Sequence, residues 1–187
     1  MGVTVIVATF GSSVWQQLAL ERAIPSAMAQ DCEVIVTHER TLAEARNRGV
    51  ELASGEWLVH LDADDRLDEG YAQAILDGTG DLRVAPLVEK CGPLRQPVRL
   101  DHRDIERVNP CHVGTGIRRE MLLDCGGWPE FRAWEDWALF LRAFRRGAVV
   151  EFLPDDGPCY VSHSRPEGRN ANVAEPWQLH RQIRAWA

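Results

Sequence analysis

Three short apolar segments, each followed by a polar segment with helical character, constrain the fold of this chain more than any other feature. They cover residues 3–10, 32–37 and 56–61, and the first two are rich in β-branched side chains. Runs of this kind are typical of strands buried on both faces of a sheet. Because strand and helix alternate in this part of the chain, the sequence predicts an α/β fold of Rossmann-like type, with a mostly parallel central sheet covered by helices.

The intervening segments carry helix start and stop signals. Ser13 with Gln16, and Thr41 with Glu44, have the spacing of a capping box, so we expect helices to begin at these points. Pro25 is expected to end or kink the first helix, because proline has no backbone N–H. Further along the chain, we expect strands over 81–90 and 148–154, helices near 68–78, 134–147 and 175–186, and an irregular excursion over 91–110. The segment 111–131 is expected to contain a strand and then a short helix that begins at about residue 119.

Composition limits the function classes. The 187 residues suggest one domain, and with a net charge of -7 nothing indicates the basic face that nucleic-acid binding needs. The five cysteines are odd in number and form no C-x-x-C pair, so we expect reduced thiols in a cytoplasmic protein. Zinc binding by the adjacent Cys111 and His112 is disfavoured by their spacing. The chain starts directly with a strand-like run and has no apolar stretch of about 20 residues, so we expect neither a signal peptide nor a transmembrane segment.

Three carboxylates follow the third strand, at Asp62, Asp64 and Asp65. Ligands of α/β sheets bind beyond the carboxyl ends of the strands, which is where this D-x-D pattern lies. Carboxylate oxygens suit Mg²⁺ or Mn²⁺, and such ions commonly bridge to the phosphates of a nucleotide. A solvated acidic turn is the commoner explanation of D-x-D when the pattern stands alone.

Several ordered blocks together resemble family 2 glycosyltransferases with the GT-A fold. The most specific one, ARNRGVELASGEWLVHLDADDRL, covers residues 45–67 and resembles the family's A-R-N-x-G and L-D-A-D-D segments. The others are VTVIVATF (3–10), IPSAMAQDCEVIV (24–36), GTGIRREMLLDCGGWPEF (114–131) and WEDWALFLRAFRRG (134–147). The resemblance implies a GT-A domain over 1–163, with a nucleotide-sugar half over about 1–66 and an acceptor half over about 84–163. Residues 164–187 are expected to form a C-terminal loop and helix packed on the same domain.

The resemblance implies a metal-dependent enzyme that moves a sugar from a nucleotide-diphosphate donor to an acceptor hydroxyl, with inversion. A UDP-sugar is the expected donor, and a glycan, a lipid-linked molecule or another hydroxyl compound is the acceptor. The residues implied to bind the donor are Thr9, Glu39, Arg46, Asp62 and Asp64. An exposed helix charge is the alternative role for Arg46, and a plain strand-end residue is the alternative for Thr9.

By the same resemblance, Asp136 is the general base and Glu135 its catalytic neighbour, in the E-D-W segment. A capping charge at the helix start is the alternative for Glu135. The metal, Mn²⁺ or Mg²⁺, is implied to bind Asp64 and His163, although His163 is equally consistent with a surface histidine. The tryptophans near this segment, Trp128, Trp134 and Trp137, are candidates for a wall against a sugar ring, with a core position as the expected alternative for Trp137. The stretch 164–172, with Arg165 and Arg169, is a candidate for closing over the donor.

The sequence departs from the family after the second strand. The family usually has D-D-G-S there, whereas this chain has Thr37-His38-Glu39-Arg40, so Glu39 is the candidate substitute for the acid that contacts the base. Two rival functions stay open. A nucleotidyltransferase also uses paired carboxylates, but the segment ATFGSSVW lacks the usual basic, glycine-rich phosphate loop. A catalytically inactive nucleotide- or sugar-binding protein of the same fold is supported only by the altered 37–40 segment.

Overall fold

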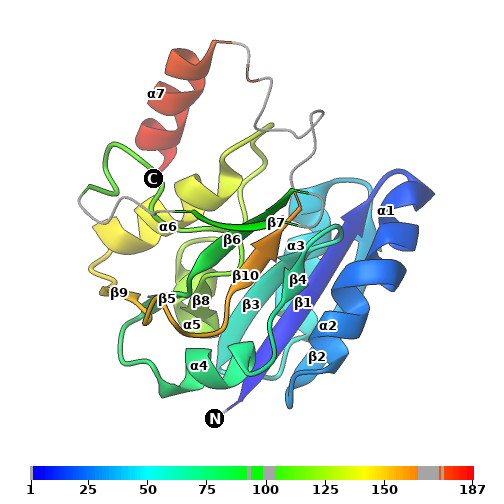
Figure 1. The fold of residues 1–187 in the computed structure, drawn as a ribbon. Coiled ribbons are helices and arrows are strands. Elements are labelled where there is room, and N and C mark those ends of the chain that lie inside the picture. Colours follow the sequence, from blue (N-terminus) through cyan, green and yellow to red (C-terminus); the bar gives the residue numbers. More distant parts are fainter. Residues whose placement is uncertain (1, 92–93, 99–103, 164–172, 174) are drawn as a thin grey trace.

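The central element is a six-stranded sheet with strand order β2-β1-β3-β8-β5-β9 (Figure 1). The computed structural model describes residues 2–91, 94–98, 104–163, 173 and 175–187. Strands β2, β1 and β3 are parallel, as are β5 and β9, while β8 runs antiparallel to both of its neighbours. The strands of this sheet are β1 (Val3–Phe10), β2 (Glu33–Glu39), β3 (Trp57–Asp62), β5 (Leu82–Val84), β8 (Gly116–Arg118) and β9 (Val150–Phe152).

A second sheet of four strands lies beside the first, in the order β4-β10-β6-β7. Its strands are β4 (Arg66–Leu67), β6 (Leu87–Cys91), β7 (Leu94–Val98) and β10 (Tyr160–Ser162). Pairing of β10 with β4 joins Tyr160 to Leu67, and so brings the end of β10 next to the turn that follows β3. This sheet corrects two expectations. The segment 81–90 is two strands rather than one, and the segment 91–110 contains β7 rather than being irregular throughout.

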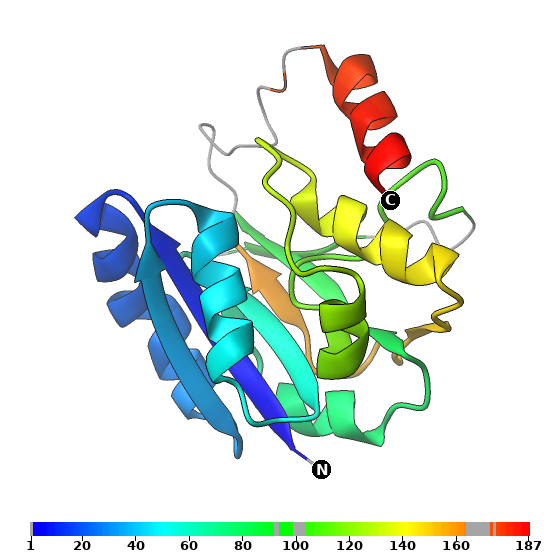
Figure 2. The same cartoon turned by 180° about the vertical axis from the view of Figure 1, so that it is seen from behind.

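Helices cover the main sheet on both faces, with α1 and α2 on one face and α3 and α5 on the other (Figures 1 and 2). The helices are α1 (Ser13–Leu18), the π-helical turn η1 (Ala19–Ala23), α2 (Ile24–Met28), α3 (Leu42–Leu52), α4 (Tyr71–Asp77), α5 (Arg119–Asp124), α6 (Glu135–Arg145) and α7 (Pro176–Trp186). Helix α3 packs closely on β1 at Gly49. A Cβ atom at this position would lie 2.3 Å from Cγ2 of Ile6, so only glycine fits there. None of the described helices is long and apolar enough to cross a membrane.

The helix signals were correct in part. Thr41 and Glu44 form the expected capping box at the start of α3, with both reciprocal hydrogen bonds present. At α1, however, the N-cap is Ser12, whose hydroxyl accepts from the N–H of Val14, so the box predicted for Ser13 and Gln16 is wrong. Pro25 does not end the helix. The π-helical turn before it absorbs the irregularity, and helical structure continues to Met28.

Candidate active site

The carboxyl end of β3 and the start of α6 are joined by ion pairs to one buried side chain, Arg46 of α3. Its side chain is only 2% exposed, and its two terminal nitrogens donate to different carboxylates. Nη2 lies 2.7 Å from Oδ1 of Asp62, the last residue of β3, and Nη1 lies 2.9 Å from Oε1 of Glu135, the first residue of α6. Two carboxylates from distant parts of the chain are therefore held at one point by a single fork of hydrogen-bond donors.

The guanidinium of Arg46 is held in place from a third side by Trp128. Its central carbon lies 4.2 Å from the centre of the Trp128 ring, in a cation–π contact. The Trp128 indole N–H donates to Nε2 of His60 at 3.0 Å, and the Trp128 backbone is bonded in both directions by the Asn47 side chain. Burial lowers the pKa of His60 well below its usual value, and the nearby charge of Arg46 adds to this effect. His60 is therefore a neutral acceptor, which this hydrogen bond requires.

Asp136 lies next to Glu135 in the first turn of α6 and is partly exposed. Burial of its carboxyl group and the charge of Glu135 raise the pKa of Asp136 to about 7, although a hydrogen bond from the Trp137 N–H and the charge of Arg46 act in the opposite direction. That N–H lies 2.8 Å from Oδ1 of Asp136. A carboxyl group with a pKa near neutrality can accept a proton at neutral pH more readily than an ordinary aspartate.

The turn after β3 is tied to the end of β10 through Asp65. The Tyr160 hydroxyl donates to Oδ2 of Asp65 at 2.8 Å, and the backbone N–H of His163 donates to Oδ1 at 2.8 Å. The Tyr160 oxygen also accepts from the backbone N–H of Asp62. Asp65 and Tyr160 therefore fix His163 beside the turn that carries Asp64. The functional prediction missed both residues. The third carboxylate of the D-x-D-D run was the available signal for Asp65, and nothing local marks Tyr160.

His163 and Asp64 are the two residues expected to hold a metal ion. Both side chains are partly exposed. Nδ1 of His163 is a buried atom with no hydrogen-bond partner. Burial and the charges of nearby arginine and lysine side chains lower the pKa of His163, so its imidazole is neutral at neutral pH. Among the described residues, no group of three His, Cys, Asp or Glu side chains lies close enough together to hold a metal ion.

The remaining predicted site residues lie at the ends of β1 and β2. The Thr9 hydroxyl lies 3.0 Å from the carbonyl oxygen of Thr37 and 3.0 Å from Nδ1 of His38, so it ties the two strand ends together. Glu39 is exposed at the end of β2. Strand register places Glu39 opposite Phe10 of β1, and places Asp62 of β3 opposite Ala8 of the same strand. Thr9, Glu39 and Asp62 thus lie at the carboxyl ends of three adjacent parallel strands.

The three tryptophans proposed as a sugar-binding wall differ in exposure. Trp128 and Trp137 are buried, and the indole N–H of Trp137 donates to the carbonyl oxygen of Ile105 at 2.8 Å. Only Trp134 is partly exposed. The wall proposed for Trp128 is therefore wrong, because its ring lies in the core, whereas the core position expected for Trp137 is confirmed. The stretch 164–172, with Arg165 and Arg169, lies outside the described residues.

Sequence comparison finds similarity between part of this chain and a known family. A model of glycosyl transferase family 2 matches residues 16–85. PGL/p-HBAD biosynthesis glycosyltransferases of Mycobacterium bovis and Mycobacterium tuberculosis are each 30% identical over 129 residues, which make up 63% of this chain and 50% of the relative. The chain thus spans about half the length of the curated relatives it matches.

Solved structures show the same fold over the whole chain. S. aureus TarS 1-349, in complex with UDP-GlcNAc, superposes with a TM-score of 0.73 at 18% identity, covering 100% of this chain and 66% of the other. The mannosyltransferase PcManGT from Pyrobaculum calidifontis, in complex with GDP-Man and Mn²⁺, has a TM-score of 0.59 at 20% identity and covers 96% and 60%. These likenesses confirm the predicted GT-A fold.

Proposed function

We propose that this chain, which is similar to glycosyl transferase family 2, transfers a sugar from a nucleotide-sugar donor to an acceptor hydroxyl, with inversion. The observation that carries this proposal is the cluster in which Arg46 joins Asp62, at the end of a central strand, to the Glu135–Asp136 pair. Ligands of such sheets bind beyond the carboxyl ends of the strands. The cluster therefore brings a carboxylate suited to the donor close to a base suited to the acceptor.

Asp136 is the proposed general base. The acceptor oxygen attacks the anomeric carbon while the bond from that carbon to the diphosphate oxygen breaks, and Asp136 takes the hydroxyl proton. Glu135 is already paired with the buried Arg46, whereas Asp136 has a pKa of about 7 and keeps some contact with solvent. Since an efficient base has a pKa near the working pH, these features favour Asp136 over Glu135.

On the donor side, we propose that Asp62 contacts the ribose or the sugar. Arg46 has both terminal nitrogens bonded to carboxylates and one ring face against it. Arg46 is therefore better suited to orienting Asp62 and Glu135 than to contacting the nucleotide directly. Thr9 and Glu39, at the neighbouring strand ends, are the proposed contacts for the nucleoside, with UDP as the expected diphosphate. The complex of S. aureus TarS with UDP-GlcNAc is consistent with that choice.

Asp64 and His163 fit a divalent cation in their chemistry. A carboxylate and a neutral imidazole with a free ring nitrogen are suitable ligands for Mn²⁺, and His163 has such a nitrogen. Mg²⁺ and similar ions usually bind through one or two protein groups, with donor phosphates and water completing the shell, so a three-residue cluster is not required. When bound, the cation neutralises charge on the departing diphosphate as a Lewis acid. The complex of PcManGT with GDP-Man and Mn²⁺ supports metal use in this fold.

The test is a panel of nucleotide sugars assayed for hydrolysis and for transfer, with wild type, Asp136→Asn and Glu135→Gln. Removing a general base lowers the rate about 10²- to 10⁴-fold. We expect that loss for Asp136→Asn, with nucleoside diphosphate binding retained, because amide and carboxylate have nearly the same shape. Glu135→Gln is expected to lose less. Wild-type turnover by Asp136→Asn, together with an inactive Glu135→Gln, would assign the base to Glu135. No turnover of any donor by the wild type would refute the proposed activity.

A further inference from the structure

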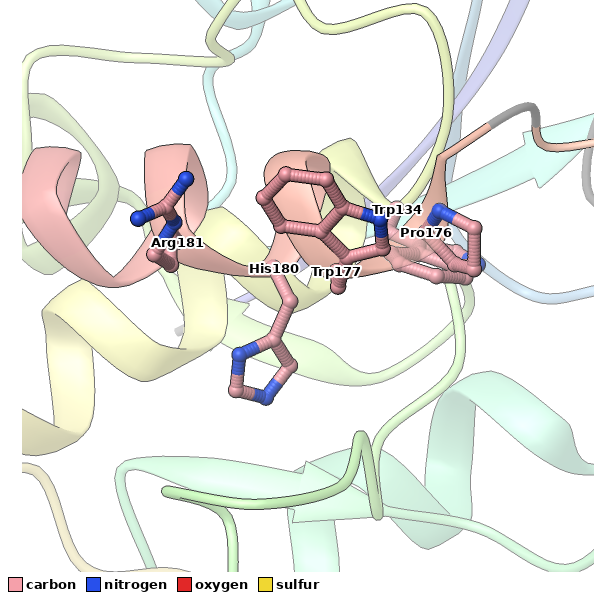
Figure 3. Close-up of a pocket in the computed structure, with 5 residues that line it drawn as sticks. All are labelled: Trp134, Pro176, Trp177, His180 and Arg181. Carbon is pink, nitrogen blue, oxygen red and sulfur yellow. The ribbon is translucent and has the colours of Figure 1, made fainter.

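A pocket of about 570 Å³ lies beside the start of α6, where the first turns of α7 face the residue that precedes Glu135 (Figure 3). Its volume is within the range of small-molecule sites. The residues that line it are Trp134, Pro176, Trp177, His180 and Arg181. None of these residues except Trp134 was singled out from the sequence, and the donor-side cluster uses none of them.

The position of the pocket relates it to the acceptor rather than to the donor. Trp134 is the N-cap of α6 and directly precedes Glu135 and Asp136. Its indole meets that of Trp137 edge to face, with ring centres 6.4 Å apart. A molecule resting on Trp134 would therefore lie against the first turn of α6, close to the proposed base. The group that must approach this base is the acceptor hydroxyl.

The wall supplied by α7 is held in place by the protein itself. Leu179 and Ile183 are buried, and the His180 ring packs against Trp137 with centres 4.7 Å apart. At the other end of the helix, Arg145 donates to the Arg184 carbonyl at 2.7 Å, and Arg142 donates to the carbonyl of Trp186. Because α7 is anchored along its buried side, the pocket does not require a ligand to assemble it.

Two features at the pocket and beside it are not explained by core packing. The Trp177 side chain is 57% exposed, and Arg181 lies over its ring at 5.0 Å. Trp134 and Glu175, the N-caps of α6 and α7, have backbone φ values of 58° and 53°, which residues other than glycine rarely adopt. They are the only non-glycine residues of the described chain with positive φ. Backbone strain of this kind costs about 1–3 kcal/mol per residue and gathers at functional sites.

We propose that this pocket is the acceptor subsite and that it binds a sugar ring of the acceptor, an inference that rests on the glycosyltransferase function proposed above. A pyranose ring has an apolar C–H face that can pack on the indole rings of Trp134 and Trp177. Its hydroxyl groups can accept hydrogen bonds from Arg181, or exchange them with His180. A purely aliphatic chain would leave these polar groups without partners on binding, which disfavours a lipid tail as the occupant.

The test measures the affinity of the protein for methyl glycosides by ligand-observed NMR. No donor is present, so the result does not depend on turnover. Trp177→Ala is expected to weaken glycoside binding about tenfold, equivalent to about 1.4 kcal/mol, while Trp177→Phe retains most of it. Gln182→Ala, an exposed change on the same helix outside the pocket, is the matched control and is expected to bind like wild type. Nucleoside diphosphate binding and a melting curve check that Trp177→Ala is folded.

Equal glycoside binding by wild type and a folded Trp177→Ala would overturn the proposal, as would stronger Trp177-dependent binding of alkyl alcohols than of glycosides. If the wild type turns over no donor but glycosides bind in a Trp177-dependent manner, the subsite stands and the catalytic proposal fails. If transfer occurs but the KM for a glycoside acceptor is unchanged in Trp177→Ala, the catalytic proposal stands and the subsite fails.

Discussion

Arg46→Met is expected to lower both the stability and the activity of the protein, for reasons that can be separated. The change keeps the aliphatic stem but removes the cation that joins Asp62 to Glu135. Removing one partner of a buried ion pair costs about 3–5 kcal/mol, because the other charge stays buried and unpaired. The Asp62 side chain is 37% exposed and remains partly hydrated, whereas that of Glu135 is 13% exposed. The loss should therefore lie near the lower limit, at about 3 kcal/mol.

For a chain of this size, 1 kcal/mol corresponds to about 2–4 °C in the melting temperature. Arg46→Met is therefore expected to melt about 6–12 °C below wild type. Arg46→Lys keeps the charge but lacks the planar fork that reaches two carboxylates at once, and should lose about half as much. Thermal melts at pH 7 measure the melting temperatures, and urea unfolding at the same pH measures the free energies of unfolding.

The pH dependence of transfer tests the functional part. The charge of Arg46 lowers the pKa of Asp136, which burial and Glu135 raise to about 7. Without that charge the pKa of Asp136 rises further, and the base must be ionised to accept a proton. The acid limb of kcat/KM is therefore expected to move to higher pH in Arg46→Met and to stay near its wild-type position in Arg46→Lys. Identical acid limbs in the two variants would refute the argument that Arg46 acts on the base through its charge.

Three further outcomes are expected. Asp64→Ala should abolish the Mn²⁺ dependence of nucleoside diphosphate binding, and His163→Ala should weaken it less. Titration calorimetry with and without chelator measures both, and binding that ignores chelator contradicts the metal role. Trp134→Gly should be about 1 kcal/mol more stable than Trp134→Ala, because both lose the indole but only glycine adopts φ of 58° without strain. Equal unfolding midpoints would argue against strain at this residue. Because the pKa of Asp136 is raised on folding, its contribution to stability is lost as pH rises from about 4 to 7, so Asp136→Asn should gain stability relative to wild type at pH 8 compared with pH 4. Parallel stability profiles in urea would contradict this.

Local patterns predicted the part of the fold in which strands that follow one another in the chain also lie side by side in the sheet. The first three apolar runs became the adjacent strands β2, β1 and β3, because each is long and bounded by clear helix signals. Asp62 and Asp64 were expected at a strand end for the same reason. Short strands that pair with distant partners gave no such signal. Strand β7 in the segment 91–110 pairs only with β6 in the described sheet and is therefore an edge strand. Its proline, which has no N–H to donate, is tolerated there because one side of an edge strand needs no hydrogen bonds.

The contacts that assemble the site were beyond sequence reasoning, because they join residues far apart in the chain. Arg46 was expected either on the nucleotide or as an exposed helix charge. Its side chain is in fact buried, which corrects the second alternative, and contact with the nucleotide stays a prediction. Nothing near position 46 indicates that its partner is Glu135, which lies 89 residues away. The same holds for Asp65 and Tyr160, which are 95 residues apart.

These two long-range links also explain why the segment that matches the family model cannot hold the complete site. The match covers residues 16–85 and contains Arg46, Asp62, Asp64 and Asp65. Arg46 is bonded outside that segment to Glu135, and Asp65 to Tyr160 and the backbone of His163. One link holds the carboxylate at the end of β3 against the helix of the proposed base, and the other holds the D-x-D turn against the proposed metal ligand. Because both partners of each link are buried or partly buried, a chain cut after the matched segment would leave Arg46 without Glu135 and Asp65 without Tyr160 and the His163 backbone. The proposed donor-side residues thus depend for their geometry on the part of the chain that holds the proposed base and acceptor subsite.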